Sequence, residues 1–238
     1  MKLGINIDHI ASLRQLRKST QPDILTAAKI VKKAKADSIV VHLREDRRHI
    51  QERDLEVLRN EIKVKLNLEM SAAKEIVDVA VHLKPDQATL VPEKRKELTT
   101  EGGLDVIKNK NKVALAVKRL KAAGIKVSLF IDPRRSQIVA SKVLGVEAVE
   151  LHTGGYANSK NVRIRKKYLK DFKTACLIAK KLGLTVNAGH GLDYDNVLEI
   201  AKIKEIVELN IGYSIICRSV FSGLYSAVKE MKTLIKRK

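Results

Sequence analysis

The chain has 238 residues, 45% of them hydrophobic, which excludes an intrinsically disordered protein and allows a sizeable core. Trp is absent and aromatic residues make up 3%, so the core has to be built from Ile, Leu, Val and Ala. The net charge of +20, from 47 Lys and Arg against 27 Asp and Glu, would attract anionic partners but does not by itself identify one.

Apolar runs of strand length alternate with helical patterns along the chain. The expected strands are Leu3–Ile7, Ser38–Leu43, Lys63–Leu68, Gln87–Val91, Lys126–Ile131, Ala148–Leu151, Leu184–Ala188 and Ile206–Ile211. Between them, apolar residues recur at helical spacing. The expected helices begin at Pro22 and after a cap at Ser71, end near Gly124 and Gly145, or cover about residues 165–182, 196–201 and 224–235.

Strands separated by crossover helices predict a parallel sheet, and eight is the number that closes a barrel. We therefore expect an α/β protein with one catalytic domain over residues 1–238, a (βα)8 TIM barrel. The alternative is an open doubly wound sheet, but no GxGxxG motif follows the first strand.

Polar residues stand at the ends of the apolar runs, and seven of the eight runs end in Asp, Glu or His. The main candidates are Asp8, His42, Glu69, Glu150 and His190. The carboxyl ends of barrel strands converge on one mouth, where active sites of this fold lie. His titrates near neutral pH, and burial can tune a carboxyl group towards it, so the pattern predicts acid–base chemistry. Asp132, before Pro133, is interpreted as a turn residue instead.

The sequence leaves two other uses of the mouth open. A metal could bind the same His and carboxylate groups, but no HxH or HExxH spacing appears and no Cys accompanies them. An enzyme-bound imine needs a Lys at a strand end, and neither Lys65, within a strand, nor Lys94, in a charged run, fits well.

Two loops carry a phosphate-binding pattern. Gly189-His190-Gly191 and Ile211–Ser214 follow the seventh and eighth runs, where barrels commonly hold phosphate on backbone N–H groups. The basic segment Arg44–His49, with Arg14 and Arg17, is either a solvated loop or a second anion site. Two anion sites would serve two phosphorylated substrates or one bisphosphate.

The basic charge is open to three interpretations: a nucleic-acid surface, a solvated Lys-rich surface, or attraction of small anionic substrates. Few aromatic residues are present for base stacking, so we expect no nucleic acid. Cys176 and Cys217 form no CxxC motif, which favours a reducing compartment. No apolar run has membrane-spanning length, and MKLGINIDHI is too polar for a signal peptide, so we expect a cytoplasmic protein without a membrane partner.

Nine motifs together resemble the pyridoxine 5′-phosphate synthase family. They are NIDHI (6–10), VHLREDRRHI (41–50), NLEM (67–70), LVPEKR (90–95), TTEGGLDV (99–106), SLFID (128–132), ELHTG (150–154), NAGHGL (187–192) and ELNIG (208–212). They run in order over the whole chain. The resemblance implies a barrel with additional helices, assembled as a homo-octamer (a tetramer of dimers), with no metal or cofactor. It also implies condensation of 3-amino-2-oxopropyl phosphate with 1-deoxy-D-xylulose 5-phosphate in vitamin B6 biosynthesis.

The resemblance also implies a role for each matching residue. His42 and Glu69 match proton acceptors, His190 a proton donor and Glu150 a transition-state stabiliser. The substrate-binding positions are Asn6, Asp8, His9, Arg17, Arg44, His49, Thr99, Gly191, Gly212 and Tyr213. Position 213 is Tyr here, where some relatives have His. The rival hypotheses are another phosphosugar isomerase or aldolase on the same barrel, and a nucleic-acid-binding protein.

Overall fold

The fold is a closed barrel of eight parallel strands, in a computed structural model that describes residues 1–93 and 102–236. Each strand pairs with the next along the chain, and β8 pairs with β1. The strands are β1 (Lys2–Asn6), β2 (Ser38–Leu43), β3 (Lys65–Met70), β4 (Gln87–Leu90), β5 (Lys126–Ile131), β6 (Ala148–His152), β7 (Thr185–Gly189) and β8 (Ile206–Ile211). The predicted TIM barrel is confirmed, and the open sheet is excluded.

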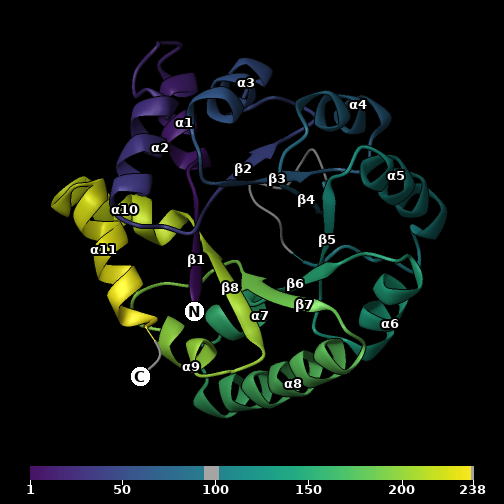
Figure 1. The fold of residues 1–238 in the computed structure, drawn as a ribbon. Helices are drawn as coiled ribbons and strands as arrows, with labels where there is room; N and C mark the ends of the chain where they lie inside the picture. The colour runs from purple at the N-terminus through teal and green to yellow at the C-terminus, as the bar shows by residue number, and fades with distance from the viewer. Residues whose placement is uncertain (94–101, 237–238) are drawn as a thin grey trace.

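Helices surround the barrel (Figure 1). They are α1 (Asp8–Leu16), α2 (Ile24–Lys33), α3 (Glu52–Glu61), α4 (Lys74–Leu83), α5 (Lys110–Ala122), α6 (Arg135–Val143), α7 (Gly154–Ala157), α8 (Val162–Lys181), α9 (Val197–Ala201), α10 (Tyr213–Ser222) and α11 (Leu224–Leu234). Helix α10 packs against α1, and α11 packs against α2, which places the C-terminal helices beside the N-terminal ones.

Several predicted boundaries were wrong for local reasons. Ser71 does not cap α4; its hydroxyl accepts from the N–H of Ala73 and donates to Glu45, and the helix begins at Lys74. Helix α8 begins at Val162, earlier than predicted, because the Asn161 side chain accepts two backbone N–H bonds there. Basic residues in that first turn oppose the helix dipole and weaken the sequence signal for a helix start.

Two further differences from the predicted boundaries affect residues at the mouth of the barrel. Strand β3 is displaced towards Met70, so Glu69 lies within the strand rather than after it. Helix α1, which the sequence pattern did not predict, starts at Asp8 directly after β1. Asp8 and His9 therefore lie in a first helical turn, not in a loop.

Each strand has an apolar outer face and a largely polar inner face. Their outward residues, such as Leu66, Leu68 and Met70 of β3, are buried with the helices in one hydrophobic cluster. Alternate residues face the barrel axis, and many of these are polar and buried: Ser38, Asn67, Gln87, Thr89, Ser128, Glu150, Asn187, Glu208 and Asn210. Hydrogen bonds link them, as from Thr89 Oγ1 to Asn67 Oδ1 at 2.8 Å. The barrel interior is therefore a polar core inside an apolar shell.

The foot of the barrel holds an ion pair across its axis. Glu208 of β8 is 2% exposed, and the Lys65 Nζ atom of β3 lies 3.1 Å from its Oε2 atom. Ser38 of β2 donates to Glu208 Oε1 at 2.7 Å. These contacts satisfy a charge that would be costly to bury alone.

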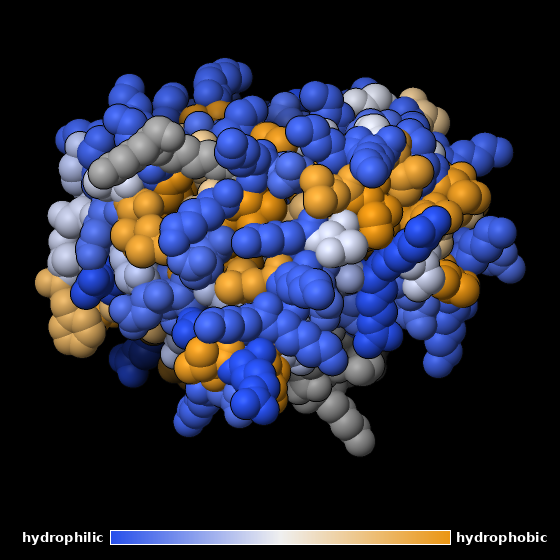
Figure 2. All heavy atoms as spheres, turned by 90° about the horizontal axis from the view of Figure 1, so that it is seen from below, coloured by the Kyte–Doolittle hydropathy of each residue, from blue (hydrophilic) through white to orange (hydrophobic). Residues whose placement is uncertain are grey.

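The face of the molecule drawn in Figure 2 is mostly hydrophilic, with hydrophobic patches between hydrophilic side chains. Basic residues are distributed over the helices, and the sequence of α8, VRIRKKYLKDFKTACLIAKK, is particularly rich in Lys and Arg. Among the described helices, none combines the length and apolar character needed to cross a membrane.

We predict that Lys65→Met destabilises the protein by about 2 kcal/mol, because it leaves the buried Glu208 carboxylate without its cation. The measurement is urea unfolding at neutral pH. Lys65→Met/Glu208→Gln should recover part of the loss, since Gln keeps an acceptor for Ser38. Lys74→Met, in a pair whose Lys side chain is 87% exposed, is the control and should change little. Equal effects of the two Lys variants would contradict the role of the ion pair.

Candidate active site

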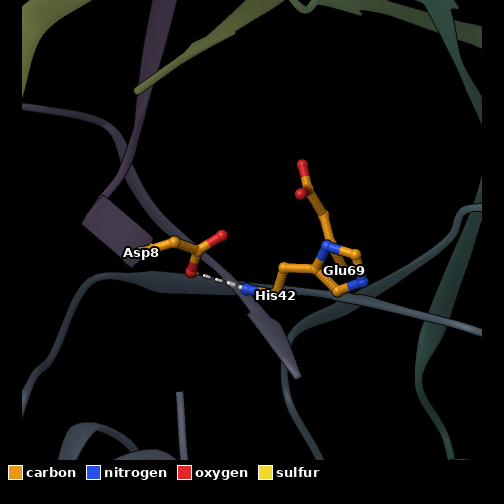
Figure 3. A group of neighbouring side chains, drawn as sticks. All are labelled: Asp8, His42 and Glu69. Atoms are coloured by element: carbon orange, nitrogen blue, oxygen red, sulfur yellow. Dashed lines mark hydrogen bonds between the residues drawn. The ribbon is translucent and has the colours of Figure 1, made fainter. Parts of the chain in front are cut away.

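The predicted acid–base residues meet at the carboxyl ends of the strands. Asp8 at the start of α1, His42 on β2 and Glu69 on β3 converge there (Figure 3). One side-chain ligand atom from each lies within 4.8 Å of the other two. At this spacing the three groups can act on one bound molecule, and they could also hold a metal ion.

Asp8 is held by its neighbours from both sides. Its Oδ1 atom accepts from the backbone N–H of His42 at 2.9 Å, the dashed line in Figure 3. Its Oδ2 atom accepts from Asn6 Nδ2 at 2.9 Å, and its own N–H donates to Asn6 Oδ1. Both carboxylate oxygens are thus engaged, so Asp8 fixes the start of α1 against β2.

His42 pairs with a residue that had no assigned role. Its Nε2 atom lies 2.9 Å from Oε1 of Glu93, and both side chains are buried. The Glu93 Oε2 atom accepts from the N–H of Glu45 at 3.0 Å. Burial would raise the pKa of Glu93, but the bond and charge of His42 outweigh it, so the pKa lies below its usual value. Glu93 therefore orients the His42 ring.

Glu69 on β3 and Glu150 on β6 lie close enough for the charge of Glu150 to act on Glu69. Burial and then repulsion from Glu150 and Asp8 raise the pKa of Glu69 well above its usual value. Burial also raises the pKa of Glu150 to about 7, although a hydrogen bond from Asn210 opposes the rise. Two carboxyl groups thus hold protons near neutral pH, which is the condition for general acid–base catalysis.

His190 follows β7 in a left-handed backbone conformation, with φ of +82°. Such a conformation is costly for a residue other than glycine and persists where the surroundings impose it. Thr153 supplies that constraint, because its Oγ1 atom donates to the carbonyl oxygens of Gly189 and His190 at 2.7 and 2.5 Å. Burial and then the charge of His152 lower the pKa of His190 to about 4, so the ring is neutral at neutral pH.

His152 and Asp132 stand next to His190. The rings of His152 and His190 have centroids 5.1 Å apart, and the Nδ1 atom of His152 lies 3.3 Å from Asp132 Oδ1. The hydrogen bond to His152 is the largest influence on Asp132 and holds its pKa below the usual value. Asp132 also accepts from the N–H of Gly103, so it is more than the turn residue that we predicted.

The arginine residues of the basic segment after β2, Arg44–His49, lie in different environments. Arg44 is buried at the mouth beside His49, and burial lowers the pKa of His49. Arg47 and Arg48 instead pair with Glu52 and Asp46. Arg14, which one of the two interpretations of this segment placed at an anion site, is engaged elsewhere. Both of its terminal nitrogens bind the Asp54 carboxylate at 2.6 Å, which locks α1 to α3.

The two glycine loops lie side by side. The Ser214 hydroxyl, in the first turn of α10 after β8, donates to the carbonyl oxygen of Leu192 in the β7 loop at 2.8 Å. Gly191 has φ of +78°, and Gly212 is the N-cap of α10, whose first N–H groups are available to an anion. A side chain at position 212 would lie 2.8 Å from the Cβ atom of Asn6, so glycine lets the loop approach β1.

Other predicted binding residues lie further out. Tyr213 is 68% exposed and contacts the ring of His9, which is also exposed, at 5.3 Å between centroids. Arg17 is exposed at the C-cap of α1. Thr99 lies outside the described residues.

Sequence reasoning assigned no role to Glu93, Asn210 or His152. Each closely follows or lies within an apolar run, and that position was the available signal. The sequence did not indicate which residues elsewhere in the barrel are their hydrogen-bond partners.

Known proteins similar to this chain were found by sequence and by structure. The family model described as "Pyridoxal phosphate biosynthesis protein PdxJ" matches residues 3–237. A pyridoxine 5′-phosphate synthase from Trichlorobacter lovleyi is 53% identical over 236 residues, covering 99% of each chain. Another, from Geobacter sulfurreducens, is 52% identical over 235 residues, covering 99% of this chain and 98% of the relative.

Solved structures with a similar barrel are more distant in sequence. KGPDC from Streptococcus mutans has a TM-score of 0.64 at 16% identity, and the match covers 99% of this chain and 97% of its own. A 4-hydroxy-2-oxoglutarate aldolase has a TM-score of 0.65 at 11% identity, with 98% and 94% covered. At these identities the likeness shows the fold alone. The family match over residues 3–237 and the 53% identity show more: this chain belongs to the PdxJ family of pyridoxal phosphate biosynthesis enzymes.

Proposed function

We propose that the chain is a pyridoxine 5′-phosphate synthase. It condenses 3-amino-2-oxopropyl phosphate with 1-deoxy-D-xylulose 5-phosphate and releases pyridoxine 5′-phosphate, inorganic phosphate and two water molecules. The observation that carries the proposal is the mouth itself, where carboxyl groups with raised pKa values and a neutral His surround one space beside two glycine loops. Curated relatives of this chain bear the same name.

His42 and Glu69 are the proposed proton acceptors. Ring closure removes several protons from carbon and nitrogen, so more than one base is needed. The raised pKa of Glu69 makes its carboxylate the minor form near neutral pH, but that form is a stronger base than an ordinary Glu carboxylate. The Glu93 carboxylate beside His42 Nε2 favours a proton on that nitrogen, which leaves Nδ1 as the acceptor.

His190 is the proposed proton donor and Glu150 the group that stabilises positive charge in the transition state. A neutral imidazole carries one N–H and one lone pair, so His190 can give a proton to the substrate from one nitrogen while its other nitrogen takes one up, and the ring stays neutral. Glu150, with a pKa of about 7, is partly ionised at neutral pH and then places negative charge in a buried site.

The substrate contacts follow the family pattern. Asn6 and Arg17 bind the aminoketone phosphate, and the deoxyxylulose phosphate is bound by Asp8, His9, Arg44, His49 and Thr99. Gly191, Gly212 and Tyr213 complete the phosphate and product contacts through backbone N–H groups. The N-terminus of α10, a helix of ten residues, supports an anion at Gly212.

The proposed reaction needs no metal, no cofactor and no enzyme-bound imine. Asp8, His42 and Glu69 have the spacing of metal ligands, but both Asp8 oxygens already accept hydrogen bonds and His42 Nε2 pairs with Glu93. Lys65 is engaged with Glu208 at the foot of the barrel. An imine between the two substrates therefore fits better than one on lysine.

We further propose a cytoplasmic homo-octamer, a tetramer of dimers, without nucleic-acid or membrane partners. Apolar side chains on α1 and α10 support self-association, because Leu16 and Phe221 are 80% and 92% exposed on helices that contact each other.

We predict that phosphate release requires both substrates together. Glu69→Gln should lower kcat by at least about 100-fold with KM little changed, because only proton transfer is lost. His190→Ala removes the proposed proton donor and should likewise lower phosphate release. The assay follows inorganic phosphate by a coupled enzyme and pyridoxine 5′-phosphate by its absorbance. Turnover of one substrate alone would point to an isomerase or aldolase, and a Glu69 variant that raises only KM would assign that residue to binding.

We also predict a pH-dependent gain in stability for Glu150→Gln. The folded pKa of Glu150, about 7, lies above the ordinary 4.5, so the folded protein loses stability as pH rises from about 4.5 to 7. The Glu150→Gln variant has no carboxyl group at this position, so its unfolding free energy does not fall for this reason. The difference in unfolding free energy between variant and wild type should therefore grow by about 3 kcal/mol over that range and stay constant above it.

The measurement is urea unfolding at several pH values, with Glu147→Gln as control. Glu147 is partly exposed, and hydrogen bonds with Val127 and Lys121 hold its pKa below the usual value against the effect of burial, so its variant should show no such growth. A Glu150 difference that is independent of pH would mean that this carboxyl group ionises as an ordinary Glu.

A further inference from the structure

Glu150 receives a short hydrogen bond from Asn210. The Asn210 Nδ2 atom on β8 donates to Glu150 Oε2 on β6 at 2.6 Å, and the two residues are 5% and 2% exposed. The bond passes over β7, which lies between the two strands in the barrel. A buried, charge-assisted hydrogen bond of this kind is stronger than one between neutral groups.

Two glycines leave the space that this pair occupies. A Cβ atom on Gly189 of β7 would lie 2.5 Å from Glu150 Oε1, and one on Gly4 of β1 would lie 2.3 Å from Asn210 Oδ1. Real Cβ atoms do not make contacts this short, so any side chain at either position would displace the pair. The strands on both sides are therefore built to accommodate the Asn210–Glu150 contact.

The charged groups around Glu150 come from two other strands. Glu69 and Lys65 lie on β3, and Glu208 lies on β8. The flanking positions in strand register, Phe130 on β5 and Asn187 on β7, are uncharged. Lys65 and Glu208 pair with each other, so their effects on Glu150 oppose one another. Asn210 is the direct hydrogen-bond donor to this carboxylate.

We propose that Asn210 is a positioning residue that orients the Glu150 carboxylate and favours its ionised form. The inference rests on the proposed function only for what Glu150 does in the reaction. The neutral amide contributes no charge of its own, so it stabilises the carboxylate without a second ion in the mouth. Without it, burial and the neighbouring acids would keep Glu150 protonated to higher pH.

The test is the titration of Glu150 in the free protein, followed by NMR of side-chain carboxyl carbons with ¹³C-labelled Glu. The Glu150 signal is assigned by its loss in Glu150→Gln. Asn210→Leu, which has similar size and no donor, should raise the titration midpoint by about one pH unit. Asn210→Ala should give the same direction of shift if Leu prevents folding. The acidic limb of the kcat profile should move with it, while KM stays within about twofold.

Thr89→Val is the matched control, because it removes other buried hydrogen bonds inside the same barrel: the one that Thr89 donates to Asn67 and the one that it accepts from Gln87. It should leave the Glu150 midpoint unchanged. Midpoints in both Asn210 variants that equal the control's would overturn the inference. A shifted midpoint in a protein that does not release phosphate from the two substrates would instead overturn the proposed function and leave the role of Asn210 intact.

Discussion

Burial of the Glu69 and Glu150 carboxyl groups is the constraint on which the rest of the mouth depends, because it is the largest cause of both raised pKa values. Two carboxyl groups that share a buried space cannot both ionise at low cost, so at least one keeps its proton near neutral pH. The neighbouring groups limit the cost of burying these charges. Asn210 supports one carboxylate by a neutral donor, and the Lys65–Glu208 pair places compensated charge at the foot of the barrel.

The fold places these carboxyl groups inside the barrel, because the inner face of its strands is polar. Strand residues alternate between an apolar outer face, covered by helices, and an inner face that carries Ser, Thr, Asn and Glu. Gly4 and Gly189 then remove side chains where the inner groups approach each other most closely. Directly after β6 and β7, Thr153 holds His190 in a left-handed backbone conformation. The proposed catalytic groups are thus held by strands and by the segments that directly follow them.

The order of the strands and most candidate residues could be predicted from the sequence, because apolar runs such as Lys126–Ile131 have clear ends. Glu69 was expected after its strand and lies within it, since an inward polar residue looks the same in sequence as the end of a strand. The partners of Glu93 and Asp132 were beyond prediction. Each bonds a histidine on a strand that only barrel closure brings near. The pKa values depend on the same three-dimensional neighbours, so they too required the structure.

The central claim is that one mouth holds the ring-forming reaction between Glu69, Glu150 and His190. A crystal structure of the protein with pyridoxine 5′-phosphate and inorganic phosphate would test it most directly. We predict the pyridine ring between these three side chains, with its phosphate on the backbone N–H groups of the Gly191 and Gly212 loops. Product bound elsewhere, or a phosphate that avoids both loops, would contradict the account.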